Sequence, residues 1–99
     1  MNMQALMKQA QNLQKDMMKA KEEIDKKEFT GESALVKVTI MGTKEVKKIE
    51  ISKESDLSVD DLEMLEDMIL VAINDAMKKI DDETEQKMGK FSSMLPGGF

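Results

Sequence analysis

In this 99-residue sequence, lysine is the residue type whose regular spacing could support binding to an anionic ligand. All fifteen basic residues are lysines, and four of them fall one or two helical turns apart, opposite the apolar positions of the same segment: Lys8, Lys15, Lys19 and Lys26. Two interpretations stay open on spacing alone. The stripe is the solvated outer face of a helix, or it is a row of point charges that follows nucleic-acid phosphates.

The amino-acid composition argues against a catalytic function. The sequence has no histidine and no cysteine, which removes the commonest general base and the thiolate nucleophile. An acidic cluster could suggest a hard-cation site, but helix capping and the helix dipole explain its residues, Asp60, Asp61, Glu63, Glu66 and Asp67. We therefore expect a non-enzymatic protein with no catalytic residues, metal, cofactor or small-molecule substrate.

The charge is distributed unevenly along the chain, whose net charge is −5. Residues 1–53 hold eleven lysines against eight acids (+3), and residues 54–99 hold four against twelve (−8). Contact with nucleic acid would thus need a local basic face. With no Arg, Trp or Tyr, the usual guanine reader and the best stacking side chains are missing, so strong sequence specificity is not expected.

The elements that must position these lysines begin with a long helix. Apolar residues spaced alternately by three and four, from Met3 through Leu6, Ala10 and Leu13 to Ile24, predict a helix over residues 2–26. At about 1.5 Å per residue this helix is about 37 Å long, which exceeds the radius of gyration of about 13 Å expected for a compact domain of this size. It must project from the domain or find a partner.

Period-two alternation then predicts a three-stranded sheet. Residues 29–33 form a short strand, and residues 34–41 pair with the strand that follows through a two-residue turn at Gly42-Thr43. This register places Val36 opposite Ile49 and Lys37 opposite Lys48 on the outer face. The predicted buried face consists of Ala34, Val36, Val38, Ile40, Ile49 and Ile51.

A second long helix begins at Ser58, a good N-cap residue with Asp61 three positions later. Its stretch 68–73 is apolar on every side, which requires cover on more than one side and predicts a contact between subunits. The predicted contact residues are Met68, Ile69, Leu70, Val71 and Ile73. Beyond Met88, glycine, serine and proline predict that the helix stops, so residues 1–90 form a single domain and residues 91–99 a flexible tail.

Several segments, in this order, resemble the YbaB/EbfC family of nucleoid-associated proteins: residues 7–14, Thr30-Gly31-Glu32-Ser33 followed by residues 35–42, and residues 64–68 with residues 72–76. The C-terminal Leu95-Pro96-Gly97-Gly98-Phe99 is similar to the ends of that family. The resemblance implies an α+β fold with a long N-terminal helix, a three-stranded antiparallel sheet and a long second helix. It also implies a tweezer-like homodimer whose arms grip duplex DNA.

The resemblance implies a bacterial DNA-binding protein of the nucleoid, with a role in nucleoid organisation or gene regulation. The sequence has no secretory core and no long apolar run, so we expect a cytoplasmic protein without a membrane partner. The alternative is a protein-interaction module that docks a partner through its Met-rich, acidic second helix. Besides the first four lysines, the candidate DNA contacts are Lys37, Lys48, Lys78 and Lys79.

Overall fold

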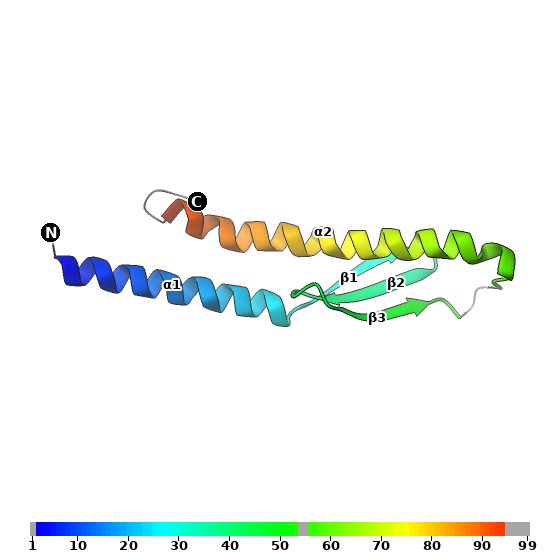
Figure 1. The fold of residues 1–99 in the computed structure, drawn as a ribbon, viewed down its shortest axis with the longest axis horizontal. Coiled ribbons are helices and arrows are strands. Elements are labelled where there is room, and N and C mark those ends of the chain that lie inside the picture. The colour runs from blue at the N-terminus through cyan, green and yellow to red at the C-terminus, as the bar shows by residue number, and fades with distance from the viewer. Residues whose placement is uncertain (1, 54–55, 95–99) are drawn as a thin grey trace.

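The computed structural model describes residues 2–53 and 56–94, which form two long helices and a three-stranded antiparallel sheet (Figure 1). The predicted α+β fold class and order of elements are confirmed. The molecule measures 71 × 21 × 14 Å, and its radius of gyration is 19.8 Å. A compact domain of this length would have about 13 Å. The excess arises because the helices extend well beyond the sheet.

The first helix, α1 (Met3–Lys26), agrees with the predicted range. It begins at Asn2, whose side chain accepts a hydrogen bond from the backbone N–H of Gln4 at 3.0 Å, as a good N-cap does. The apolar seam is covered only toward the C-terminal end, where Ile24 is buried. In the part of the chain that the structure describes, nothing covers the N-terminal turns of α1.

The sheet has the order β1-β2-β3, with β1 (Glu28–Ser33), β2 (Val36–Met41) and β3 (Val46–Ile51). The second helix, α2 (Leu62–Met94), crosses one face and packs on β1 and β2 (Figure 1). The core lies between them and at the end of α1. It consists of Ile24, Phe29, Val36, Val38, Ile40, Ala72, Ala76 and Ile80.

The predicted pairing of β2 with β3 is wrong by two residues, because the connecting loop is longer than two residues. The Met41 N–H donates to the Glu45 carbonyl at 2.9 Å, which leaves a three-residue loop, and Lys44 takes a left-handed φ of 74°. A bulge next to Ile40 adds one further residue to β3. Val36 therefore lies opposite Ile51 instead of Ile49.

This register also corrects the predicted outer face. Lys37 lies opposite Glu50, and Lys48 lies opposite Thr39, so the two lysines do not oppose each other. The predicted buried face is correct for the three apolar residues of β2 but wrong for the other three. Ala34 is an exposed turn residue with φ of 45°, and Ile49 and Ile51 remain 45% and 38% exposed because α2 does not cover β3.

Gly31 sets the distance between β1 and α2. A Cβ at this position would lie 1.9 Å from the carbonyl oxygen of Ala72 and 2.6 Å from the nitrogen of Ala76. Only glycine opposite small helix residues allows this approach. The outer edge of β1 is also occupied, since Asp75 accepts from the Glu32 N–H at 3.3 Å and Lys79 donates to the Thr30 carbonyl at 2.7 Å.

The second helix starts as predicted and ends later than predicted. A 3-10 turn, η1 (Val59–Asp61), precedes α2, and the Asp61 carboxylate accepts from the Ser58 N–H at 2.9 Å. The helix does not stop near Gly89 but continues to Met94, since Phe91 is buried in the contact with α1. The predicted end of the helix near Gly89 is thus wrong, and residues 95–99 of the predicted flexible tail lie outside the described residues.

Candidate nucleic-acid interface

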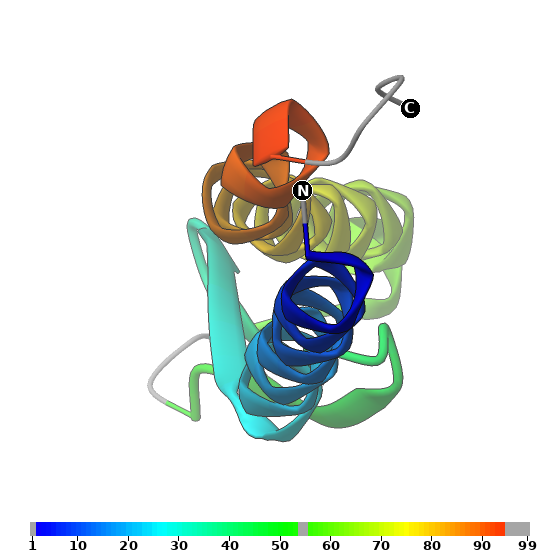
Figure 2. The same ribbon diagram turned by 90° about the vertical axis from the view of Figure 1, so that its left-hand side faces the viewer.

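A two-helix arm extends from the sheet. It consists of α1 and the C-terminal part of α2 (residues 81–94), which run side by side in opposite directions (Figure 1 and Figure 2). Leu13, Met17 and Ala20 are half-buried, and Phe91 is 6% exposed. Toward the N-terminus, Met3 is 72% exposed, so among the described residues α1 alone forms the tip of the arm.

The α1 lysine stripe, composed of Lys8, Lys15, Lys19 and Lys26, lies along the side of α1 away from this seam. All four side chains are exposed. The spacings of seven, four and seven residues correspond to about two, one and two turns, which keeps them in line. Among the described residues, none of the four forms an ion pair with a carboxylate.

The other four predicted lysines lie elsewhere, and two of them are engaged. Lys48 forms an ion pair with Glu50 at 2.9 Å, and this hydrogen bond lowers the pKa of the Glu50 carboxyl. Lys79 contacts Asp75 at 3.3 Å as well as the β1 edge. Lys37 is exposed on the sheet face away from α2, and Lys78 is exposed on α2. The four α1 lysines therefore form one row along a single helix, whereas Lys37 and Lys48 lie on the outer face of the sheet and Lys78 and Lys79 lie on α2.

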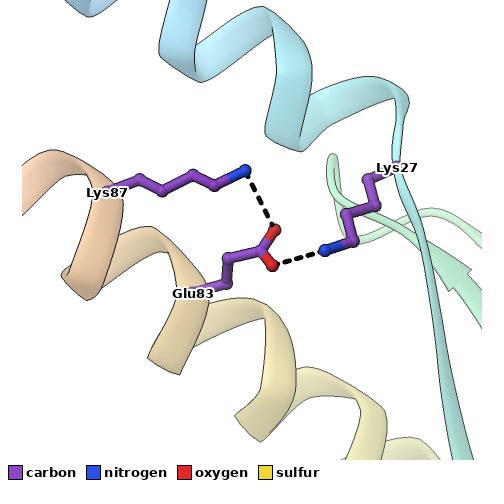
Figure 3. Close-up of polar contacts among 3 residues, drawn as sticks. All are labelled: Lys27, Glu83 and Lys87. Atoms are coloured by element: carbon purple, nitrogen blue, oxygen red, sulfur yellow. Dashed lines mark hydrogen bonds and ion pairs between the residues drawn. The ribbon is translucent and has the colours of Figure 1, made fainter.

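The base of the arm is held by a charged cluster of three residues that joins the end of α1 to α2 (Figure 3). Glu83 of α2 accepts a hydrogen bond from Lys27, at the end of α1, and its other carboxylate oxygen lies 3.7 Å from Lys87. The hydrogen bond from Lys27, helped by Lys87, lowers the pKa of the Glu83 carboxyl. Lys27 also lies 5.4 Å from the ring centroid of Phe29.

The tip of the β2–β3 hairpin supports the same junction. The Gly42 N–H donates to the Lys27 carbonyl at 2.9 Å, and a Cβ on Gly42 would lie 1.7 Å from the Ile24 carbonyl oxygen. Lys44 forms an ion pair with Asp81 at 3.1 Å. These residues position the arm, and sequence reasoning missed them because their partners lie far apart along the chain.

The acidic cluster predicted to cap α2 lies at the opposite end of the molecule from the arm tip. In the part of the chain that the structure describes, no three potential metal ligands gather into a group. Nor does any helix of that part have the length and hydropathy to cross a membrane.

A model of the YbaB/EbfC DNA-binding family matches residues 1–95. The chain belongs to this family. It is 46% identical to a nucleoid-associated protein of Ligilactobacillus salivarius over 98% of this chain and 94% of the relative. A nucleoid-associated protein of Clostridium botulinum is 48% identical over 98% of this chain and 87% of that protein.

The fold of this family member also matches a solved structure. An uncharacterized protein from Helicobacter pylori superposes with a TM-score of 0.68, covering 96% of this chain and 99% of that chain, at 20% sequence identity. This likeness concerns the fold alone. Among the segments on which the family resemblance rests, Thr30-Gly31-Glu32-Ser33 has an evident structural role, since Gly31 allows β1 to contact α2.

The residues predicted to join subunits divide into two groups in this YbaB/EbfC protein. Met68, Ile69 and Ile73 are half-buried and pack against the core of their own chain. Leu70 and Val71 are 59% and 54% exposed. Within the single chain the stretch is thus covered on one side only, and its predicted role in a subunit contact stays a prediction.

Proposed function

We propose that this protein is a nucleoid-associated protein that binds duplex DNA as a homodimer, largely through contacts between lysines and phosphates. Family membership and the names of the relatives support it. The observation that carries it is the α1 lysine stripe: four exposed lysines, in line on a projecting helix, without carboxylate partners among the described residues. A nucleoid location, with a role in nucleoid organisation or gene regulation, belongs to the same proposal.

The dimensions of the stripe suit a duplex. From Lys8 to Lys26 is about 27 Å at about 1.5 Å per residue, which corresponds to about eight base steps of about 3.4 Å. Each lysine that contacts a phosphate releases condensed counterions, and this release drives non-specific binding. Lysines already paired with carboxylates, such as Lys48 and Lys79, contribute less because a competing contact must be lost.

The charge distribution favours the arm over the opposite end. Residues 2–15 contain two lysines and no acid, whereas residues 56–67 contain six acids and no base. A duplex is attracted to the tip and repelled from the start of α2. In the proposal, this local difference allows a chain of net charge −5 to bind a polyanion.

The homodimer in this proposal uses the apolar surface that α2 leaves open. Asp75 and Lys79 hold one flank of α2 over β1, so the opposite flank, which carries Ile69 and Ile73, faces β3. The β3 residues Val46, Ile49 and Ile51, which lie on the same sheet face as the core, also remain partly exposed, as do Leu62 and Leu70 of α2. A second copy on this surface would bury these side chains and leave both arms projecting.

Changing the four lysines of the α1 stripe together to glutamine tests the DNA interface. Glutamine keeps the helix propensity and the solvation of an exposed position, so the fold should persist. We expect most affinity for random duplex DNA to be lost. If two to four lysines per protomer touch phosphates, the slope of log affinity against log salt should flatten by about 0.9 for each contact.

The matched control changes Lys37, Lys48, Lys78 and Lys79 to glutamine, which removes the same charge from other surfaces. It should retain most of the affinity. If the stripe variant bound duplex DNA with unchanged affinity and unchanged salt slope, the α1 lysine stripe would be a solvent-exposed helix face with no role in DNA binding. Absence of any salt-dependent binding by the unmodified protein would favour the docking-module alternative.

One observation favours that alternative. Leu62 and Met64 are 53% and 44% exposed among the acids that begin α2. An acidic helix with exposed apolar side chains suits a basic partner protein. Retained binding of such a partner by the lysine-stripe variant would separate this role from DNA binding.

A further inference from the structure

The outward face of α1 carries more than lysines. Gln4, Lys8, Gln11 and Lys15 follow one another at spacings of four, three and four, so they share one face of the helix. All four are exposed. In the N-terminal half of α1, amide side chains therefore alternate with the lysines of the stripe.

The two halves of α1 differ in the anionic side chains that would meet a duplex. Residues 2–15 contain no acid, whereas residues 16–26 contain Asp16, Glu22, Glu23 and Asp25. The acid-free half of α1 is also the half that extends past the described end of α2 (Figure 1). Leu6 and Met7 in this half are 44% and 60% exposed, whereas Ile24 at the other end of α1 is buried. Only this half combines free access with an absence of charge repulsion.

A single projecting helix has the size of a DNA groove. An α-helix with its side chains is about 10–12 Å across, and the major groove is about 12 Å wide. Gln4 and Gln11 lie about 10 Å apart along the axis, which matches about three base steps. With Lys8 and Lys15 on the same face, the amides can approach base edges while the ammonium groups contact phosphates.

The hydrogen-bonding groups of the glutamine amide determine which base it can recognise. Glutamine offers one acceptor and one donor side by side, which pair with the N6 amino group and N7 of adenine in the major groove. The bidentate guanine reader, arginine, does not occur in this sequence. Direct readout by the two amides therefore favours A·T pairs.

We propose that Gln4 and Gln11 contact adenine edges in the major groove and give the protein a preference for duplexes with adenine at those positions. This inference rests on the proposed DNA binding. It assigns the lysines of the stripe to positioning on the backbone and the two glutamines to base recognition. Asn12, exposed beside Gln11, extends the same amide surface.

The test compares two duplexes with two variants. One duplex is A·T-rich, and the other has the same sequence with every adenine replaced by 7-deazaadenine, which lacks the N7 acceptor. The variant Gln4→Ala/Gln11→Ala removes both amides from the outward face. The control Gln9→Ala/Gln14→Ala removes two exposed amides from the flanks of the same helix. Alanine has the higher helix propensity, so helicity should be retained in both.

Fluorescence polarisation, repeated at several salt concentrations, measures the affinity of each variant for each duplex. The unmodified protein and the control variant should bind the adenine duplex about tenfold more tightly than the 7-deaza duplex. Gln4→Ala/Gln11→Ala should bind both about equally, with an unchanged salt slope, because its lysines remain.

The outcomes also separate this inference from the DNA-binding proposal. Equal affinity of the unmodified protein for both duplexes overturns base readout but leaves the lysine–phosphate proposal intact. The same holds if the control variant loses the preference as fully as Gln4→Ala/Gln11→Ala. Failure of the unmodified protein to bind either duplex overturns both proposals together.

Discussion

Where β1 crosses α2, the two backbones approach so closely that Gly31 has no room for a methyl group. At the tip of α1, about two turns of helix stand with apolar side chains exposed, Met3 to 72%. Close packing at the β1–α2 contact stabilises the fold, whereas the N-terminal end of α1 is loosely packed and its surface remains accessible. The contrast indicates that substitutions at the sheet should act on stability, and substitutions at the tip on binding.

The largest effect is expected for Gly31→Ala. The new Cβ would overlap the backbone of α2 at Ala72, so β1 or α2 must shift and the core must open. We expect a loss of about 3 kcal/mol or more in the free energy of unfolding, measured by urea denaturation. Gly89→Ala on the arm is the control: apart from its chain neighbours and the backbone of its own helix, no atom lies within 4 Å of the added Cβ, and the change should stabilise the helix by about 0.5–1 kcal/mol. Similar stability of Gly31→Ala and wild type would show that this contact is looser than described.

Ile49→Asp tests the apolar surface at the sheet end. Ile49 is 45% exposed in the single chain, so the charge should cost the protomer little but would be buried without a partner in the proposed dimer. We expect the dimer dissociation constant to rise at least about a hundredfold, measured by analytical ultracentrifugation. Leu6→Asp, at a position 44% exposed on the tip, should leave the dimer intact. The reverse pattern would place the subunit contact at the arms.

Glu83→Gln weakens the junction between the two regions. The variant loses the charge that pairs with Lys27 and Lys87, and we expect a loss of at most about 1 kcal/mol at pH 7 because both lysines are partly exposed. The folded-state pKa of Glu83 is lowered from 4.5, so the charged carboxylate stabilises the fold above that pH, and this contribution falls as the pH drops through the folded-state pKa. The difference in stability between wild type and variant should therefore shrink below pH 4.5. A difference that grows with acid would contradict the assignment.

The smallest effect is expected from neutralising the acids that begin α2. Asp60→Asn/Glu63→Gln/Asp67→Asn removes three exposed charges while leaving the capping Asp61 in place. The molecule is 71 Å long, and charges are screened over about 8 Å at 0.15 M salt, so DNA affinity should change by less than about twofold. An increase of tenfold at that salt would show that DNA passes close to this end.

The sequence by itself determined the elements whose pattern is local. The seam from Met3 to Ile24 predicted α1 nearly to the residue, and Ser58 with Asp61 predicted the start of α2, because helix periodicity and capping involve residues a few positions apart. The alternation in β2 likewise identified its buried face. The α1 lysine stripe was visible for the same reason, since one helix places its own residues in line.

Tertiary structure decided whatever depends on partners distant in sequence. The loop at Lys44 and the bulge near Ile40 changed the register of β3, and α2 left Ile49 exposed although its pattern predicted burial. The helix α2 continues past Gly89 because the ring of Phe91 is buried against α1, some seventy residues earlier in the chain. Lys79 is held by the β1 edge, so its availability to DNA could not be judged from its position on a helix. These outcomes depend on which surfaces pack together in the folded chain. The periodicity of a sequence reports on neighbouring residues only, so it does not predict such contacts.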